Sequence, residues 1–119
     1  MAEPVDLAAV LSQIEAPWKP QTVAVLNDYD LRVVKVHGEF SQHSHPETDE
    51  AFLVLRGSMT IRLDADDVAL AAGQLHVVPR GVQHQPVSIE SAEVLLIEPS
   101  ATVNTGDSPS EFTIDPSRR

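Results

Sequence analysis

The segment Gly38–Leu63, GEFSQHSHPETDEAFLVLRGSMTIRL, decides how this sequence folds. Its second half contains two short runs rich in Val, Leu and Ile on either side of Gly57, a pattern typical of β-strands separated by a turn. Similar runs occur on both sides of the segment. Together they predict eight short strands, at residues 21–26, 29–36, 50–55, 59–63, 68–71, 75–78, 82–89 and 93–97. Many short strands at close spacing predict an all-β sandwich or barrel.

A single short helix is predicted near the N-terminus. Asp6 is a good N-cap residue, and the apolar residues from Leu7 to Ile14 recur at helical spacing. Pro17 and Pro20 end the helix. Because the helix has one apolar face, we expect it to pack as a lid on the outside of the barrel. The chain then divides into a helix with its lead-in (1–20), a barrel (21–99) and a C-terminal arm (100–119).

The charge balance argues against nucleic acids and membranes as partners. Eighteen Asp and Glu residues against eight Lys and Arg residues give a net charge of −10. A duplex or an anionic membrane repels such a surface, because binding there depends on Lys and Arg. The first residues are acidic and lack the basic region of a secretory signal, so we expect a cytoplasmic protein. Cysteine is absent, which excludes disulfides and thiolate metal sites.

Histidines and acidic residues gather in the quoted segment. Residues two apart on an extended strand point to the same side, so His43 and His45 present two imidazoles to one face. Glu50 opens the next predicted strand, and its carboxylate meets those imidazoles if that strand runs antiparallel. Asp49 is the rival carboxylate, one residue out of phase with the apolar barrel face. His84 follows a Pro-Arg-Gly turn and adds a third imidazole, which gives a ligand set that suits Fe, Mn, Zn, Ni or Cu.

Two spaced motifs resemble those of the cupin superfamily. The first is Gly38, four residues, His43-Ser-His45, four residues, Glu50, six residues and Gly57. The second is Gly73, five residues, Pro79-Arg80-Gly81, two residues and His84. The resemblance spans residues 21–99 and implies a double-stranded β-helix, or jelly-roll, barrel. It also implies that one divalent transition-metal ion is held by the residues at the family's ligand positions, which here are His43, His45, Glu50 and His84.

The sequence departs from the family pattern in two places. The gap between Gly38 and His43 is one residue shorter than the usual form. Ser88 stands where the second motif often ends in Asn, so a partner behind the ligands differs. His76 lies on a strand in phase with Val78 and is interpreted as a core or pocket histidine. His37 has no partner by spacing. The aromatic residues Trp18 and Phe40 are assigned to packing.

Four functions are compatible with a metal-binding cupin. The favoured one is a mononuclear metalloenzyme with dioxygenase-like chemistry on a small, mostly neutral organic molecule; no catalytic acid, base or organic cofactor is assigned. Thiol dioxygenation is disfavoured, because relatives with that activity replace the Glu ligand. One alternative is a small-ligand-binding or sensing module without turnover, and another is a structural metal site. A sugar isomerase-like cupin is the last, although the cations available to hold a phosphosugar are scattered: Lys35, Arg56, Arg62 and Arg80.

The predicted strands also bear on assembly. Ala51–Leu55 and Val94–Ile97 are apolar on both faces, so either the helix or a second subunit must cover the outer face. A homodimer is the expectation. Residues 100–119 are rich in Ser, Thr, Pro, Asp and Gly and predict a loosely held tail, in which 112–114 is the one stretch able to dock as an edge strand.

Overall fold

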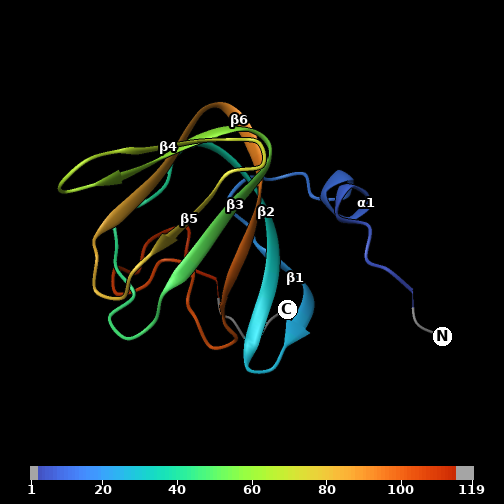
Figure 1. The fold of residues 1–119 in the computed structure, drawn as a ribbon, viewed down its shortest axis with the longest axis horizontal. Coiled ribbons are helices and arrows are strands. Elements are labelled where there is room, and N and C mark those ends of the chain that lie inside the picture. Colours follow the sequence, from blue (N-terminus) through green and yellow to red (C-terminus); the bar gives the residue numbers. More distant parts are fainter. Residues whose placement is uncertain (1–2, 115–119) are drawn as a thin grey trace.

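The computed structural model describes residues 3–114, and their fold is all-β with one short helix, as predicted (Figure 1). The elements in chain order are α1 (Leu7–Ser12), β1 (Gln21–Leu26), β2 (Tyr29–Glu39), β3 (Glu50–Leu63), β4 (Val68–Ala71), β5 (Leu75–Val78) and β6 (His84–Pro99). All strand pairs are antiparallel. The hydrogen-bonded order is β1-β2-β6-β3-β4, and β5 pairs with the first half of β3.

Two long strands, β3 and β6, form the middle of the sheet. The sequence predicted each as two strands separated by a turn, and this was wrong. The register of the β3–β6 pair shifts between Val54 and Arg56 and again between Gly57 and Thr60, so the chain bends through bulges instead of turning back. The bend lets β3 pair with β5 along one half and with β4 along the other. Bulges of this kind are how a strand follows the curvature of a barrel.

The inward side chains of the strands form the main core. It contains thirteen buried residues, among them Val54, Ile61 and Val94, which have no exposed surface. These residues alternate along β3 and β6 with outward-facing ones, as a half-buried strand requires.

The helix covers the outer face of the sheet, as predicted. Asp6 caps α1 by accepting a hydrogen bond from the backbone N–H of Ala9, at 3.1 Å. Leu11 and Ile14 pack with Val33 and Leu95 in a second apolar cluster outside the barrel. This packing accounts for strands that are apolar on both sides. Among residues 3–114, no helix is long and apolar enough to cross a membrane.

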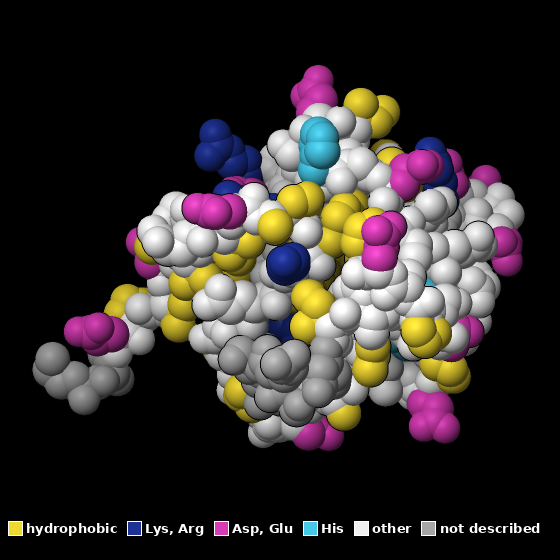
Figure 2. Space-filling model, turned by 180° about the vertical axis from the view of Figure 1, so that it is seen from behind, with side chains coloured by type: hydrophobic (Ala, Val, Ile, Leu, Met, Phe, Trp, Pro, Cys, Tyr) yellow, Lys and Arg dark blue, Asp and Glu magenta, His cyan; other side chains and the backbone are white. Residues whose placement is uncertain are grey.

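On one face of the molecule, charged side chains are spread out rather than grouped by sign (Figure 2). On the face shown in Figure 2, acidic side chains stand around the periphery and the Lys and Arg side chains lie apart from one another. This distribution gives no basic patch on that face.

Candidate metal centre

The structure brings the four predicted ligand residues together inside the barrel. Glu50 is the first residue of β3 and His84 the first of β6, while His43 and His45 lie on the connection between β2 and β3. All four side chains are buried, and their ligand atoms lie within 4.8 Å of one another. The expected strand through His43 and His45 is absent: His43 instead forms an isolated antiparallel bridge with His84, which still fixes both backbones.

The hydrogen bonds of two imidazoles fix which nitrogen faces the centre. Nδ1 of His43 lies 2.9 Å from the carbonyl oxygen of Ser41, and Nδ1 of His84 lies 2.9 Å from that of Val82. A carbonyl oxygen only accepts, so each Nδ1 carries the hydrogen and each Nε2 keeps its lone pair. A histidine that binds a metal through Nε2 has this tautomer, with its Nδ1–H donated to a carbonyl oxygen.

Three of the ligand atoms lack a hydrogen-bond partner within the described part of the chain: Nε2 of His45, Oε1 of Glu50 and Nε2 of His84. Oε1 of Glu50 lies 3.2 Å from the first nitrogen and 3.3 Å from the second. Buried polar atoms without partners are costly, and a cation between them would satisfy all three. With metal–ligand bonds of about 2.1 Å, opposite ligands lie about 4.2 Å apart, so the set needs only a small closure to hold one ion.

Burial and charge tune the cluster toward metal binding. Burial, together with the repulsion of His84, lowers the pKa of His43 to about 4, so this imidazole is neutral near pH 7. Burial alone would raise the pKa of Glu50. A hydrogen bond with Glu98 and the close approach of His45 and His84 outweigh it and hold that pKa well below its ordinary value. A neutral imidazole and an ionised carboxylate are the forms that bind a metal.

Sequence reasoning missed a buried charged network behind Glu50. Glu98 has no exposed surface, and burial followed by the charge of Glu50 raises its pKa well above the ordinary value, despite the ion pair with Arg32. Arg32 donates to Glu98 at 2.8 Å and to Asp30 at 3.3 Å. It also donates to the carbonyl oxygens of Ser100 and Thr102. The available signal was the presence of charged residues, Arg32 and Glu98 among them, in two apolar strands, and it also fits solvent-facing positions.

The remaining candidates lie outside the cluster. Asp49 is exposed and accepts from the backbone N–H of Arg80, so Glu50 is the carboxylate at the centre. His76 is half-buried on β5, and exposed His37 has its Nδ1 2.8 Å from the carbonyl oxygen of Glu90. Ser88, the departure from the usual Asn, donates to the carbonyl oxygen of Ser58 and ties β6 to β3.

The segment 100–114 packs against the loop that carries the two histidines, in contrast to the loosely held tail that the sequence predicted. Ser44 donates its backbone N–H and its hydroxyl to the carboxylate of Asp107, at 2.9 and 3.0 Å. A Cβ on Gly106 would stand 2.1 Å from the carbonyl oxygen of Ser44, so only glycine fits this approach. Residues 112–114 form no strand, and residues 115–119 of the predicted arm lie outside the described residues.

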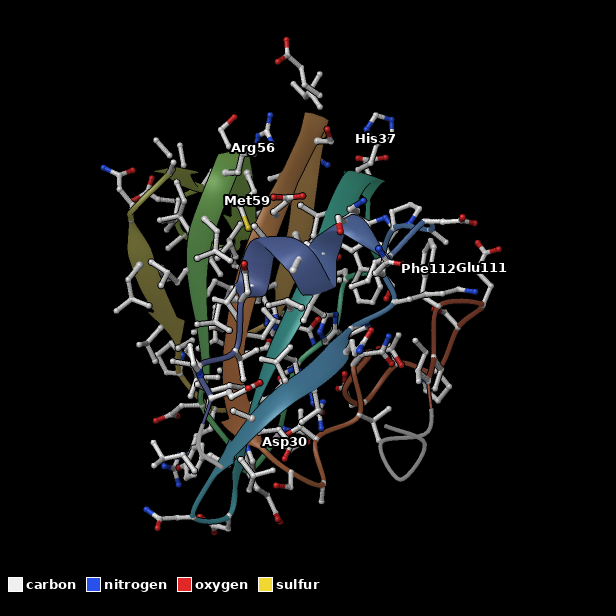
Figure 3. The ribbon with its side chains drawn as sticks, turned by 90° about the vertical axis from the view of Figure 1, so that its right-hand side faces the viewer. Asp30, His37, Arg56, Met59, Glu111 and Phe112 are labelled. Atoms are coloured by element: carbon white, nitrogen blue, oxygen red, sulfur yellow. The ribbon has the colours of Figure 1, made fainter. Side chains whose placement is uncertain are left out.

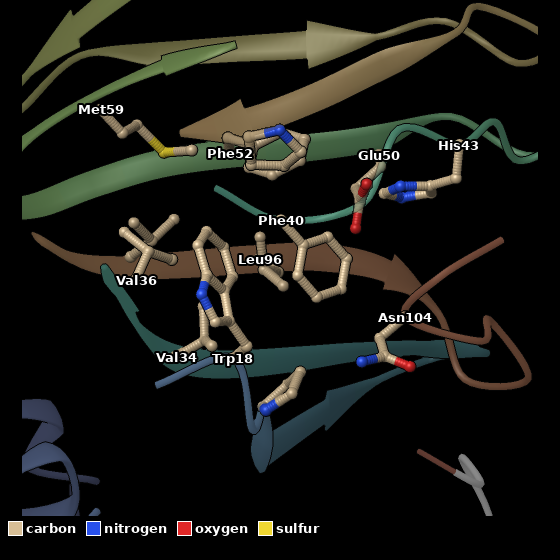
Figure 4. A pocket seen from close by; sticks show the side chains of 13 residues that line it. Trp18, Val34, Val36, Phe40, His43, Glu50, Phe52, Met59, Leu96 and Asn104 are labelled. Atoms are coloured by element: carbon tan, nitrogen blue, oxygen red, sulfur yellow. The ribbon is translucent and has the colours of Figure 1, made fainter. Parts of the chain in front are cut away.

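An apolar cavity of about 30 Å³ adjoins the centre (Figure 4). His43 and Glu50 line it at one end, and among residues 3–114 Asn104 is the one other polar residue in its wall. The rest of the wall is apolar, formed by Trp18, Pro20, Val34, Val36, Phe40, Phe52, Met59, Pro86, Val94 and Leu96. A bound ion would therefore face a dry chamber.

Comparison with known proteins agrees with this architecture. The family model described as "Cupin domain" matches residues 31–98. The uncharacterized protein YdbB of Bacillus subtilis is 27% identical over 99 residues, covering 82% of this chain and 88% of that protein. A cupin-2 domain containing protein from Shewanella frigidimarina is 37% identical, with a TM-score of 0.78 over 80% of this chain and 93% of its own. Protein NMB1881 from Neisseria meningitidis is 26% identical, with a TM-score of 0.75 over 82% of this chain and 100% of its own. The family match over more than half of the chain, on the strands that surround the His and Glu cluster, makes this protein a member of the cupin superfamily.

Proposed function

We propose that this cupin binds one divalent transition-metal ion through His43, His45, Glu50 and His84. Support comes from the three buried ligand atoms without hydrogen-bond partners in the described chain and from the two imidazoles whose Nε2 lone pairs are free. When bound, an ion with three imidazoles and one carboxylate keeps open coordination positions and supplies a Lewis-acid site for a substrate oxygen or for O2.

On this centre we propose a mononuclear metalloenzyme that oxidises a small organic molecule with O2. The observation that carries the proposal is the apolar cavity, since two of the ligand residues, His43 and Glu50, form part of its wall. The apolar wall excludes water and places a substrate against the ligands. The backbone carbonyls of Ser41 and Val82 hold the imidazole rings in orientation.

Metal analysis followed by oxygen-uptake measurements tests this function. Protein purified without a tag is analysed for bound metal, then reconstituted with Fe, Mn, Ni or Cu and assayed with phenols, diketones and oxo acids. We expect uptake with at least one pair of metal and substrate class, and its loss in His84→Ala. His76→Ala is the matched control, because it removes an imidazole outside the cluster. Uptake that persists in His84→Ala would contradict the proposal.

A ligand-binding module without turnover is the second candidate. It is favoured by one observation: apart from the proposed ligands, no acidic or basic side chain lines the cavity within the described residues. Saturable binding of a small molecule to the metal-loaded protein, with no product formed, would establish this candidate. A sugar isomerase-like activity is disfavoured, because Arg62 and Arg80 are exposed and pair with Glu39 and Asp49.

A homodimer remains our proposal for the assembly. Leu75 and Val77 point outward from β5 with 57% and 45% of their surface exposed, which is unusual for neighbouring apolar side chains on one strand face. Sedimentation velocity across a concentration series tests it, and a monomer at all concentrations would refute it. We also propose a cytoplasmic location. Cell fractionation tests it, and recovery of the protein outside the cytoplasmic fraction would refute it.

A further inference from the structure

The cavity beside the metal centre offers almost nothing to a polar ligand. The one polar wall residue outside the ligand cluster, Asn104, uses its amide within the C-terminal segment: Nδ2 donates to the carbonyl oxygen of Phe112 at 2.7 Å, and Oδ1 accepts from the N–H of Ile114 at 2.8 Å. A sugar or a charged ligand would lose its hydrogen bonds to water on entry without replacing them. The wall therefore favours a ligand that is apolar except where it meets the metal centre.

The aromatic residues of the chain concentrate at this cavity. The sequence has three Phe, one Trp and one Tyr. Trp18, Phe40 and Phe52 line the cavity, and Phe112 packs against the same core. The ring centroids of Trp18 and Phe40 lie 4.8 Å apart, and those of Phe40 and Phe112 lie 5.0 Å apart. Three of the five aromatic rings thus pack on one another in tilted pairs, an arrangement that can receive another ring.

Trp18 is held at this place against backbone preference. Its φ is +65°, a conformation that is strained for a bulky residue. Hydrogen bonds from its backbone N–H to the carbonyl oxygen of Lys35 and from its indole N–H to that of His37 maintain it. Because the indole N–H is already bonded, the ring presents only its apolar surface to the cavity. A strained backbone held by two hydrogen bonds indicates that the position of the Trp18 ring matters for the cavity, beyond filling space in the core.

The cavity is closed in this structure to anything larger than a few atoms. Its volume of about 30 Å³ is far below the roughly 150 Å³ of an apolar cavity that admits benzene. Phe112 rests on Phe40 and Trp18 from the C-terminal side, with ring centroids 5.0 and 6.4 Å away. Figure 3 shows Phe112 on the C-terminal segment beside Glu111. Another ring that stacks on Phe40 and Trp18 from this side would have to take the place of Phe112.

The segment that carries Phe112 makes most of its hydrogen bonds within itself. Residues 103–114, here called the strap, are bonded internally by the pair Thr105 and Thr113 and by the Asn104 amide. Within the described chain, the hydrogen bonds from the strap to the barrel all join Asp107 to Ser44. Behind the strap, Arg32 fixes the carbonyl oxygens of Ser100 and Thr102. A hinge after Thr102 would free Phe112 once the Asp107 contacts break.

We propose that the cavity binds a small uncharged aromatic molecule, whose ring takes the stacking position on Phe40 and Trp18 that Phe112 fills when the strap is closed. The inference rests on the proposed function in one respect, because it names the substrate class of that site. The residues that build the ring site do not bind the metal, so the two can be tested apart.

Toluene, which has no metal-binding atom, is the probe. Trp18 is the one tryptophan of the chain, so its fluorescence reports directly on the site. We expect toluene to change this fluorescence saturably in metal-free protein. Phe112→Ala should bind toluene about tenfold more tightly, because the open form no longer has to compete with the Phe112 ring. Glu111→Ala is the matched control on the strap and should bind as the wild type does.

Asp107→Ala gives a second route to the open form without touching the aromatic wall, and we expect it also to tighten toluene binding. The inference is overturned if folded Phe112→Ala and Asp107→Ala bind toluene no more tightly than Glu111→Ala. It is also overturned if mannose perturbs Trp18 as toluene does. Toluene binding by a protein that takes up no metal would sink only the proposed function, and metal uptake without toluene binding would sink only this inference.

Discussion

Acidification of the metal-free protein is expected to destabilise it through His43. The folded protein lowers the pKa of this imidazole to about 4, chiefly by burial and then by repulsion from His84, while in the unfolded chain it titrates near 6.5. As the pH falls, the His43 imidazole therefore binds a proton in the unfolded state before it does so in the folded state. Stability from this group is complete above about pH 6.5 and is lost as the pH falls toward 4.

The loss between pH 7 and pH 5 follows from these two values. At pH 7 the unfolded imidazole is mostly neutral and the two states differ little. At pH 5 the unfolded imidazole is almost fully protonated, whereas the folded one carries a proton about one-tenth of the time. The resulting difference is about 2 kcal/mol of unfolding free energy.

Two neighbouring carboxyls must be separated from this effect. The pKa of Glu98 is raised, so its contribution runs the other way: folding is favoured as the pH drops through its folded value. The pKa of Glu50 is lowered, so its contribution is lost only below about pH 4.5, outside the window. A variant that lacks only the His43 imidazole keeps both carboxyls, so their contributions drop out when the variant is compared with the wild type.

Urea unfolding of EDTA-treated protein at pH 7 and pH 5 is the assay. His43→Gln should lose about 2 kcal/mol less than the wild type over this interval, and His37→Gln serves as the control for losing an exposed imidazole. A difference below about 0.5 kcal/mol, the usual error of additivity, would refute the reasoning.

Three further predictions concern stability. Gly57 and Gly73 share a positive φ, but a Cβ on Gly57 would stand 2.4 Å from the carbonyl oxygen of Ser91 while one on Gly73 meets nothing. Gly73→Ala should cost about 1 kcal/mol and Gly57→Ala clearly more, by thermal denaturation; equal costs would contradict this packing. Arg32→Ala should cost about 3–5 kcal/mol in urea unfolding, because it strands the buried Glu98, and a cost below about 1 kcal/mol would show the network to be dispensable. A proposed metal present at 100 times its Kd should stabilise the fold by about 2.7 kcal/mol, or a melting temperature higher by about 10 °C, and no shift with any of the five metals would contradict the metal site.

The His and Glu cluster was predictable because the spacing of its residues along the chain determines which side of the backbone each side chain faces. Two histidines two residues apart on an extended chain must point the same way, and this holds although His43 and His45 lie on a loop with one bridge. Glu50 was separable from Asp49 by the motif spacing to Gly57 and by strand phase, since only one of two consecutive residues on a strand faces the interior. The glycines at the motif positions take positive φ, as the turns and bulges require.

The misses have physical causes. Gly57 signals a break in β3, but whether the chain turns back or bulges depends on the partner strand, which the local sequence does not contain. Arg32 and Glu98 each look like solvent-facing residues until their strands pair and bring them together. The strap has the composition of a loose tail, and its docking depends on contacts with residues far away in the sequence, those of Asp107 with Ser44 and of Phe112 with Trp18.

Both ends of the chain converge on the same chamber, and this sets the smallest working unit of the protein. Trp18 lies before residues 31–98, which match the family, and Asn104 and Phe112 lie after them. A barrel trimmed to the matched residues would retain all four ligand side chains but lose one wall and the cover of its chamber. A version of this cupin trimmed to residues 31–98 is therefore suited to metal titration and unsuited to tests of ligand binding in the cavity.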